Sequence, residues 1–232
     1  MTTAKYKLTK ETISVNGKTL YRIEALKDFS DVKKGDKGGF IENENNLTQY
    51  GKCWVYDNAT VSGYAMVHNN ATVSGNAKVS GNAIIHDDAK VYGDAWVYGN
   101  AIVRDNAEVC GNAKVHGDAM VYEKAKIYGN AKVSGNAVVF GDAEVCGKAE
   151  VCDEAIVCGN AIVANDSDYI VFKNWWSSGR YFTWTKSNNM WKVGCFYGSG
   201  KQLINKAYMD SELSGREYER VVRYVDKDYR NG

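Results

Sequence analysis

Histidine and arginine side chains at a regular interval are the residues of this sequence best suited to chemistry. His68 and His86 are 18 residues apart, and Arg104 follows His86 at the same interval. An imidazole can act as a general base, bind a metal ion or hydrogen-bond an anion, and a guanidinium also binds anions. His116 lies outside this series. Whether the three residues act together depends on a fold that repeats every 18 residues.

A six-residue repeat occupies the middle of the chain. Alanine stands at every sixth position from Ala59 to Ala161, eighteen times without interruption, and Val or Ile follows each alanine by two positions. Residues two apart in a strand point to the same face, so each Ala and Val form an inward pair. The Gly-Asn or Asp-Asn pair that follows tolerates the positive φ of a sharp corner. Frequent Gly and Asp argue against the alternative, an amphipathic helix.

Three such units close a coil of 18 residues, so residues 51–166 predict a parallel β-helix of about six coils. Positions 18 apart then stack on one face, which places His68, His86 and Arg104 in one column. Such a column predicts a ligand-binding site, with His86 as an alternative catalytic base. The other interpretation is a polar rim on an exposed strand.

This repeat resembles the hexapeptide pattern of left-handed β-helix proteins, and the resemblance implies a left-handed coil and a trimer. The segment KKGDKGGFIENENNLTQYGKCWVYDNA, from Lys33 to Ala59, resembles the opening of uncharacterised hexapeptide-repeat proteins of phages and prophages, which include the YdcK-like proteins. Residues 193–200 (VGCFYGSG), leading into a helix, resemble a small C-terminal module of other phage proteins. The resemblances imply a phage or prophage origin, and no activity follows from them.

The outward residue before each Val or Ile distinguishes the three faces of the predicted coil. The first face carries Trp54, Thr72, Lys90, Glu108, Lys126, Glu144 and Ile162. The second face carries Thr60, Lys78, Trp96, Lys114, Lys132 and Glu150. The third face has no polar member in this slot and carries Met66, Ile84, Ile102, Met120, Val138 and Ile156.

The apolar strip of the third face widens toward its C-terminal end, where Tyr122 and Phe140 occupy the slot after Val. An apolar strip of this length predicts an interface, because exposing a large apolar surface to water is unfavourable. Either another subunit covers the strip or the C-terminal module folds back over it. A lysine at Thr60, on the second face, is predicted to be tolerated.

The flanking segments predict two further units. Residues 1–50 form an N-terminal cap, with a β-hairpin of residues 6–15 and 19–26 around an Asn16-Gly17 turn. Residues 167–232 form an α+β module with strands at about 169–176, 180–185 and 191–197, a Ser177-Ser178-Gly179 turn, and helices at about 202–212 and 216–228. Here Arg180, Trp176, Trp184 and Trp191 predict a stacking site for a ligand ring, or else the core of a small domain.

Composition narrows the functional classes. The chain has 29 Lys and Arg against 28 Asp and Glu, which disfavours nucleic acid and anionic membranes as partners. The opening MTTAKYKLTKE lacks an apolar signal region, and no stretch of about 20 apolar residues follows, so we expect a cytoplasmic location, in the host if the protein is phage-encoded. The six cysteines include no CxxC pair, and we expect no metal and no cofactor. Cys146, Cys152 and Cys158 fall on different faces and cannot pair.

The leading hypothesis is a non-enzymatic phage or prophage binding and assembly protein. It would form a homo-oligomer and antagonise host defence by sequestering a ligand, such as a nucleotide signal, or by binding a host protein. The alternative is a hexapeptide-type acyltransferase that uses acyl-coenzyme A, with His86 as its base, although no loop interrupts the coil to carry a catalytic histidine. A purely structural assembly module is the third hypothesis.

Overall fold

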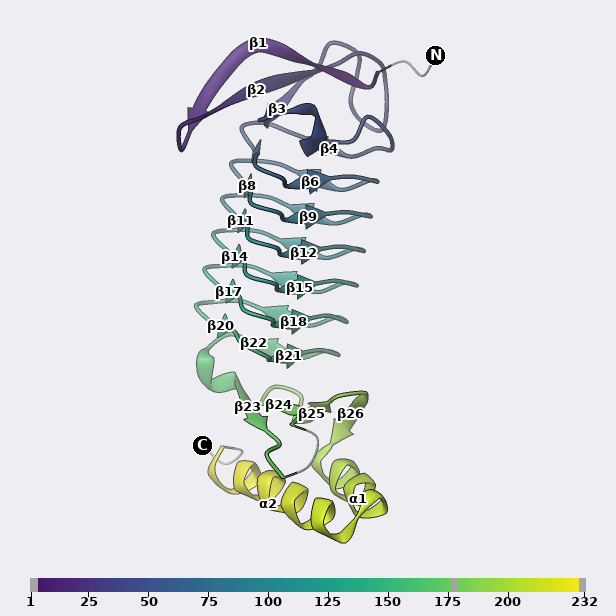
Figure 1. Cartoon of the computed structure of the whole chain (residues 1–232), viewed down its shortest axis with the longest axis vertical. Coiled ribbons are helices and arrows are strands. Elements are labelled where there is room, and N and C mark those ends of the chain that lie inside the picture. Colours follow the sequence, from purple (N-terminus) through teal and green to yellow (C-terminus); the bar gives the residue numbers. More distant parts are fainter. Residues whose placement is uncertain (1–3, 177–178, 230–232) are drawn as a thin grey trace.

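The protein is mainly β, and three units follow one another along its long axis (Figure 1). The computed structural model describes residues 4–176 and 179–229. An antiparallel hairpin stands at one end, a parallel β-helix forms the middle, and two helices lie at the other end. No helix within the described residues has the length and apolarity needed to cross a bilayer.

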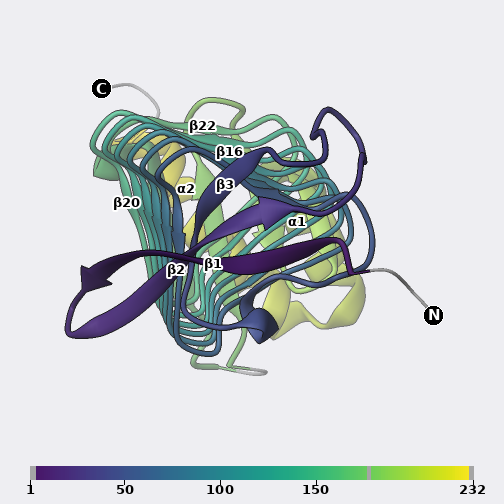
Figure 2. The same cartoon turned by 90° about the horizontal axis from the view of Figure 1, so that it is seen from above.

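Each hexapeptide unit forms one two-residue strand and one corner, as the repeat predicts. The alanine and valine of each unit fill the interior and are buried throughout the coil. Each backbone pairs with the next coil; for example, the N–H of Ile102 donates to the carbonyl of Ala119 at 2.9 Å. Viewed from above, the coils lie over one another in a single stack (Figure 2). The parallel coil of 18-residue turns is therefore confirmed, and it fits the expected hexapeptide-type β-helix.

Within the repeat, the strands of each face pair in parallel at the expected positions, and β3 (Lys37–Ile41), which precedes the repeat, extends the second face. The first face contains β4 (Trp54–Val55), β7 (Thr72–Val73), β10 (Lys90–Val91), β13 (Glu108–Val109), β16 (Lys126–Ile127), β19 (Glu144–Val145) and β22 (Ile162–Val163). The second face contains β3 (Lys37–Ile41), β5 (Thr60–Val61), β8 (Lys78–Val79), β11 (Trp96–Val97), β14 (Lys114–Val115), β17 (Lys132–Val133) and β20 (Glu150–Val151). The third face contains β6 (Met66–Val67), β9 (Ile84–Ile85), β12 (Ile102–Val103), β15 (Met120–Val121), β18 (Val138–Val139) and β21 (Ile156–Val157). Seven strands on the first face and six on the third give between six and seven coils.

The N-terminal hairpin covers the first coil. Strands β1 (Tyr6–Val15) and β2 (Lys18–Ala25) pair antiparallel, and β2 pairs with β3, which continues into the second face. The short 3-10 helix η1 (Glu44–Asn46) lies over the start of the third face, because the Asn46 amide donates to the Ala65 carbonyl at 2.8 Å. Thr60 is only 9% exposed beside Phe40 of β3, so the prediction that a lysine is tolerated there is wrong.

The C-terminal residues form a four-stranded antiparallel sheet and two helices. The strands are β23 (Tyr169–Lys173), β24 (Tyr181–Thr185), β25 (Met190–Val193) and β26 (Phe196–Ser199), after the 3-10 helix η2 (Asp166–Asp168). The helices are α1 (Gly200–Asp210) and α2 (Glu212–Asp228). One expected strand at 191–197 is in fact two, because Gly194 has φ +52° and reverses the chain. The expected turn residues Ser177 and Ser178 lie outside the described residues.

Candidate functional site: the third face of the β-helix

The apolar strip of the third face remains open to solvent over most of its length. Met66 is 42% exposed and Met120 is 36% exposed, and the strip residues between and below them are partly exposed. Their side chains point away from the Ala and Val core, as the phase of the repeat predicts. Six apolar residues stacked one coil apart thus form a continuous surface.

The C-terminal module lies beyond the last coil and does not extend along the upper strands of the third face, β6 to β15 (Figure 1). Its Thr183 hydroxyl accepts a hydrogen bond from the Ile156 N–H at 2.9 Å, and its Ser187 hydroxyl accepts one from the Ile162 N–H at 2.7 Å. Lys192 lies against the lower end of the third face, with its ammonium 5.8 Å from the centre of the Phe140 ring. The alternative in which the module folds back over the strip is therefore not what the chain adopts.

A column of rings and cations runs beside the strip, in the slot after Val. The rings of His68 and His86 stack with centres 5.1 Å apart and planes within 2°. The Arg104 guanidinium lies 4.3 Å from the centre of the Tyr122 ring, which stacks on Phe140 at 5.0 Å. The structure therefore brings together the three residues that the 18-residue interval selected, and it joins two aromatic residues to them.

Carboxylates lie against two of the nitrogen-bearing side chains of this column. His86 Nδ1 lies 2.9 Å from the Asp87 carboxylate, and an Arg104 Nη1 atom lies 2.8 Å from the Asp105 carboxylate. Both aspartates occupy the corner directly after the column residue. A carboxylate on Nδ1 fixes the orientation of an imidazole and leaves Nε2 as its second functional nitrogen. We did not predict these partners, although their position next to His86 and Arg104 in the sequence was a usable signal.

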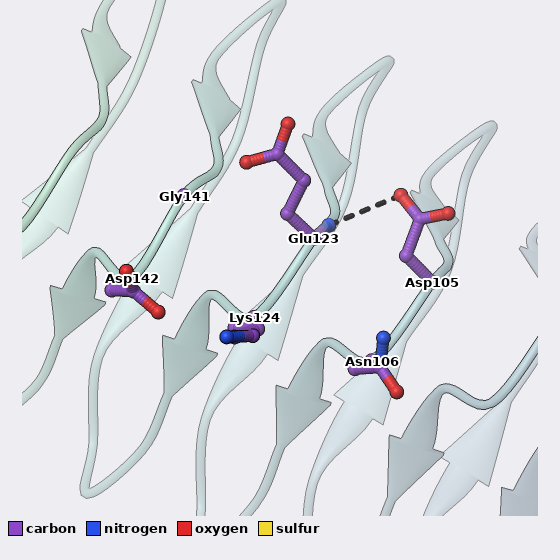
Figure 3. Close-up of a pocket in the computed structure, with 6 residues that line it drawn as sticks. All are labelled: Asp105, Asn106, Glu123, Lys124, Gly141 and Asp142. Carbon is purple, nitrogen blue, oxygen red and sulfur yellow. Dashed lines mark hydrogen bonds between the residues drawn. The ribbon is translucent and has the colours of Figure 1, made fainter.

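The corner between the third and first faces differs from the other two corners. Asn69, Asp87, Asp105 and Glu123 adopt positive φ there, between 57° and 59°, where glycine occupies most other corners. A hydrogen bond joins two successive coils at this corner, because the Glu123 N–H donates to the Asp105 carboxylate at 3.1 Å (Figure 3). An open hollow of about 420 Å³ follows this corner, lined by Asp105, Asn106, Glu123, Lys124, Gly141 and Asp142.

The aromatic residues of the C-terminal module form its core. Trp184 and Trp191 are buried with Phe182, and the Trp184 indole donates to Asn189 at 3.0 Å. Their ring faces are occupied by protein, so they cannot stack on a ligand. Trp176 packs against this core, and Arg180 is exposed. The sequence left two roles open for these residues, a ligand-stacking site or the core of a small domain. Trp184 and Trp191 have the second role.

The cysteines and acidic residues do not assemble into a metal site within residues 4–176 and 179–229. Cys146, Cys152 and Cys158 follow strands of the first, second and third faces, respectively, and all six cysteines are free thiols. Burial raises the pKa of the Cys158 thiol to about 11. Cys146, Cys152 and Cys158 are therefore packing residues of the coil.

Comparisons with known proteins agree with the fold over short segments. A family model described as the YdcK beta solenoid repeat matches residues 55–69. The protein named uncharacterized acetyltransferase YdcK, from Escherichia coli (strain K12), is 47% identical over 49 residues. The aligned segment is 21% of this chain and 15% of that protein, so the chain matches only a small part of the relative.

Proposed function

We propose that this protein is a self-associating binding scaffold whose third face packs against other copies of the chain. The observation that carries the proposal is the uncovered apolar strip from Met66 to Ile156. A strip of side chains spaced one coil apart is matched best by a surface with the same spacing, and a second copy of the coil has it. The hexapeptide resemblance favours a trimer.

The ligand of such a scaffold is proposed to be a small anion-bearing molecule, such as a nucleotide signal. The column of His68, His86 and Arg104 supports this, because it presents nitrogen donors at the edge of the strip. Between subunits these donors would be screened from water, which strengthens hydrogen bonds to phosphate. Together with the phage resemblance, this supports antagonism of host defence by sequestration.

The experiment is a native mass measurement of the wild-type chain and of Val138→Lys. We expect the wild type to be a homo-oligomer and Val138→Lys to have a lower mass, because a buried interface would have to desolvate the new ammonium. Ser134→Lys, on the second face of the same coil, is the matched control and should keep the wild-type mass. A Val138→Lys chain of unchanged mass would show that the third face is not an interface.

An acyltransferase is the second candidate, and two observations favour it. The relative with 47% identity over 49 residues carries the name acetyltransferase, and His86 has the Asp87 partner that a general base needs. Heating the purified protein and identifying the small molecules released separates the two candidates. Nucleotide supports sequestration, whereas stoichiometric coenzyme A supports the enzyme, in which His86→Ala should abolish acyl transfer.

A further inference from the structure

The first face carries two columns of side chains that alternate with the same period. The slot before Val reads Lys90, Glu108, Lys126 and Glu144, so positive and negative charges alternate from coil to coil. The slot after Val reads Tyr92, Cys110, Tyr128 and Cys146, so large and small side chains alternate in the same coils. Four consecutive coils therefore carry a lysine with a tyrosine or a glutamate with a cysteine.

Two copies of this face complement each other in charge and size when a twofold axis relates them. A twofold axis that lies in the face, parallel to its strands, reverses the order of the coils and keeps each column opposite its own copy. When the axis passes midway between Glu108 and Lys126, Glu108 of one copy faces Lys126 of the other. Lys90 then faces Glu144, so all four charges meet an opposite charge.

The same axis also matches the sizes of the side chains. Cys110 of one copy faces Tyr128 of the other, and Tyr92 faces Cys146, so each bulky ring stands opposite a small thiol. Moving the axis to the level of Glu108 would instead oppose Lys90 and Lys126. One axis position therefore satisfies both columns.

The side chains concerned are accessible in the isolated chain. The Lys90 side chain is 57% exposed, Lys126 is exposed, and the two glutamates and two tyrosines are partly exposed. Within the chain the Tyr92 hydroxyl donates to Glu108 at 3.2 Å and the Tyr128 hydroxyl donates to Glu144 at 2.8 Å. The Lys90 ammonium lies 3.5 Å from the Glu108 carboxylate, and the two charges remain partly open to a second copy. At the rim the twofold brings Asp88 near Asp142, and water screens that pair because neither side chain is buried.

We propose that the first face is a second interaction surface, which binds a second copy of this chain in the antiparallel sense through a twofold axis between Glu108 and Lys126. This contact is separate from the third-face contact proposed above. Alternating charge also avoids like charges on stacked strands within one chain. The test must therefore separate pairing between chains from pairing within one chain.

The experiment uses Val138→Lys as a background, because this substitution removes association through the third face. In that background the chain should be a dimer. Lys126→Glu places two glutamates opposite each other at both central contacts, and Glu108→Lys places two lysines there. Each variant should weaken the dimer by about tenfold or more, measured by native mass spectrometry over a dilution series. Lys114→Glu, on the second face, is the matched control.

Mixing the two variants gives the decisive result. In a dimer with one chain of each kind, the glutamate introduced at position 126 of the first chain faces the lysine introduced at position 108 of the second. The unchanged Glu108 of the first chain faces the unchanged Lys126 of the second, so both contacts are opposite in charge. Equal amounts of the two variants should therefore form a mixed dimer with nearly the affinity of the background dimer. A substitution that acts only within its own chain would not be compensated by mixing. Circular dichroism of each variant is needed only to show that its coil is folded.

Two results would overturn this inference. One is a monomeric Val138→Lys background, which leaves the third-face proposal standing if the wild type is larger. The other is a mixture that dimerises no better than either variant alone. A third combination separates the two proposals. If Val138→Lys keeps the wild-type mass and the mixed variants still dimerise, the first-face contact stands and the third-face contact is rejected.

Discussion

The backbone N–H of Ile156 donates a hydrogen bond to the Thr183 hydroxyl at 2.9 Å, and this bond joins the last strand of the third face to the C-terminal sheet. The strands above it pair with a following coil, whereas Ile156 has none below it. Thr183 is 1% exposed, so the hydroxyl that accepts this bond is buried. A side chain of the module thus replaces the backbone acceptor that a further coil would supply.

Thr183→Val should destabilise the junction, because it removes the acceptor and leaves the Ile156 N–H buried without a partner. An unsatisfied buried donor costs about 1–3 kcal/mol. We expect earlier proteolytic cleavage between the coil and the C-terminal module, followed by mass spectrometry, while the coil itself stays folded. Thr183→Ser retains the hydroxyl and serves as the control. Equal protease resistance of the Val and Ser variants would assign the junction to other contacts.

Gly117→Ala should destabilise the coil more than Gly17→Ala destabilises the hairpin. Both glycines have positive φ, +74° and +77°, where a Cβ costs about 1–2 kcal/mol. A Cβ at Gly117 would lie 2.9 Å from the Gly135 backbone nitrogen of the next coil, whereas nothing lies within 4 Å of one at Gly17. The difference between the two midpoints of chemical denaturation measures the cost of crowding between coils. Identical losses would mean that the coils shift apart freely.

Cys158 should resist alkylation at pH 8 while Cys195 reacts. Burial raises the pKa of Cys158 to about 11, so roughly a thousandth of its thiol is ionised at that pH, and only the thiolate attacks the reagent. Cys195 is exposed in the turn between β25 and β26. Peptide mass spectrometry after timed iodoacetamide treatment gives both rates, and the Cys158 rate should rise with pH up to about 11. Equal rates at pH 8 would contradict the burial of Cys158.

Glu42 should make the N-terminal cap less stable as the pH falls into the acid range. The ammonium of Lys18 and the N–H of Gly63 hold the pKa of this carboxyl below its usual value. A carboxyl whose pKa is lower in the folded chain than in the unfolded chain stabilises the fold at pH values above its unfolded-state pKa. This stabilisation is lost as the pH falls through the folded-state pKa. The protection factor of the Gly63 amide, which is its exchange rate relative to the intrinsic rate at the same pH, should therefore fall on acidification. Glu42→Gln should remove this contribution, and an unchanged profile in that variant would exclude Glu42.

The register of the coil could be predicted from the sequence because its period is strict. With Ala and Val fixed inside at every sixth residue, the direction of every other side chain follows from the alternation of a strand. This is why the His68 and His86 stack, the apolar strip and the separation of Cys146 from Cys152 and Cys158 were all predictable. The positions of the N-terminal hairpin strands also followed, because the Asn16-Gly17 turn is a local signal.

Only the tertiary structure decided what covers each outward position. Thr60 and Met66 are both outward residues of the first coils, yet Thr60 is buried by the cap and Met66 is exposed. Trp184 and Trp191 are core residues because the sheet and helices of the C-terminal module close over them, which their spacing does not reveal. Likewise the module packs on the end of the coil and not along the strip. Periodicity specifies the direction of a side chain within its own coil, whereas its burial depends on contacts between segments that have no period in common.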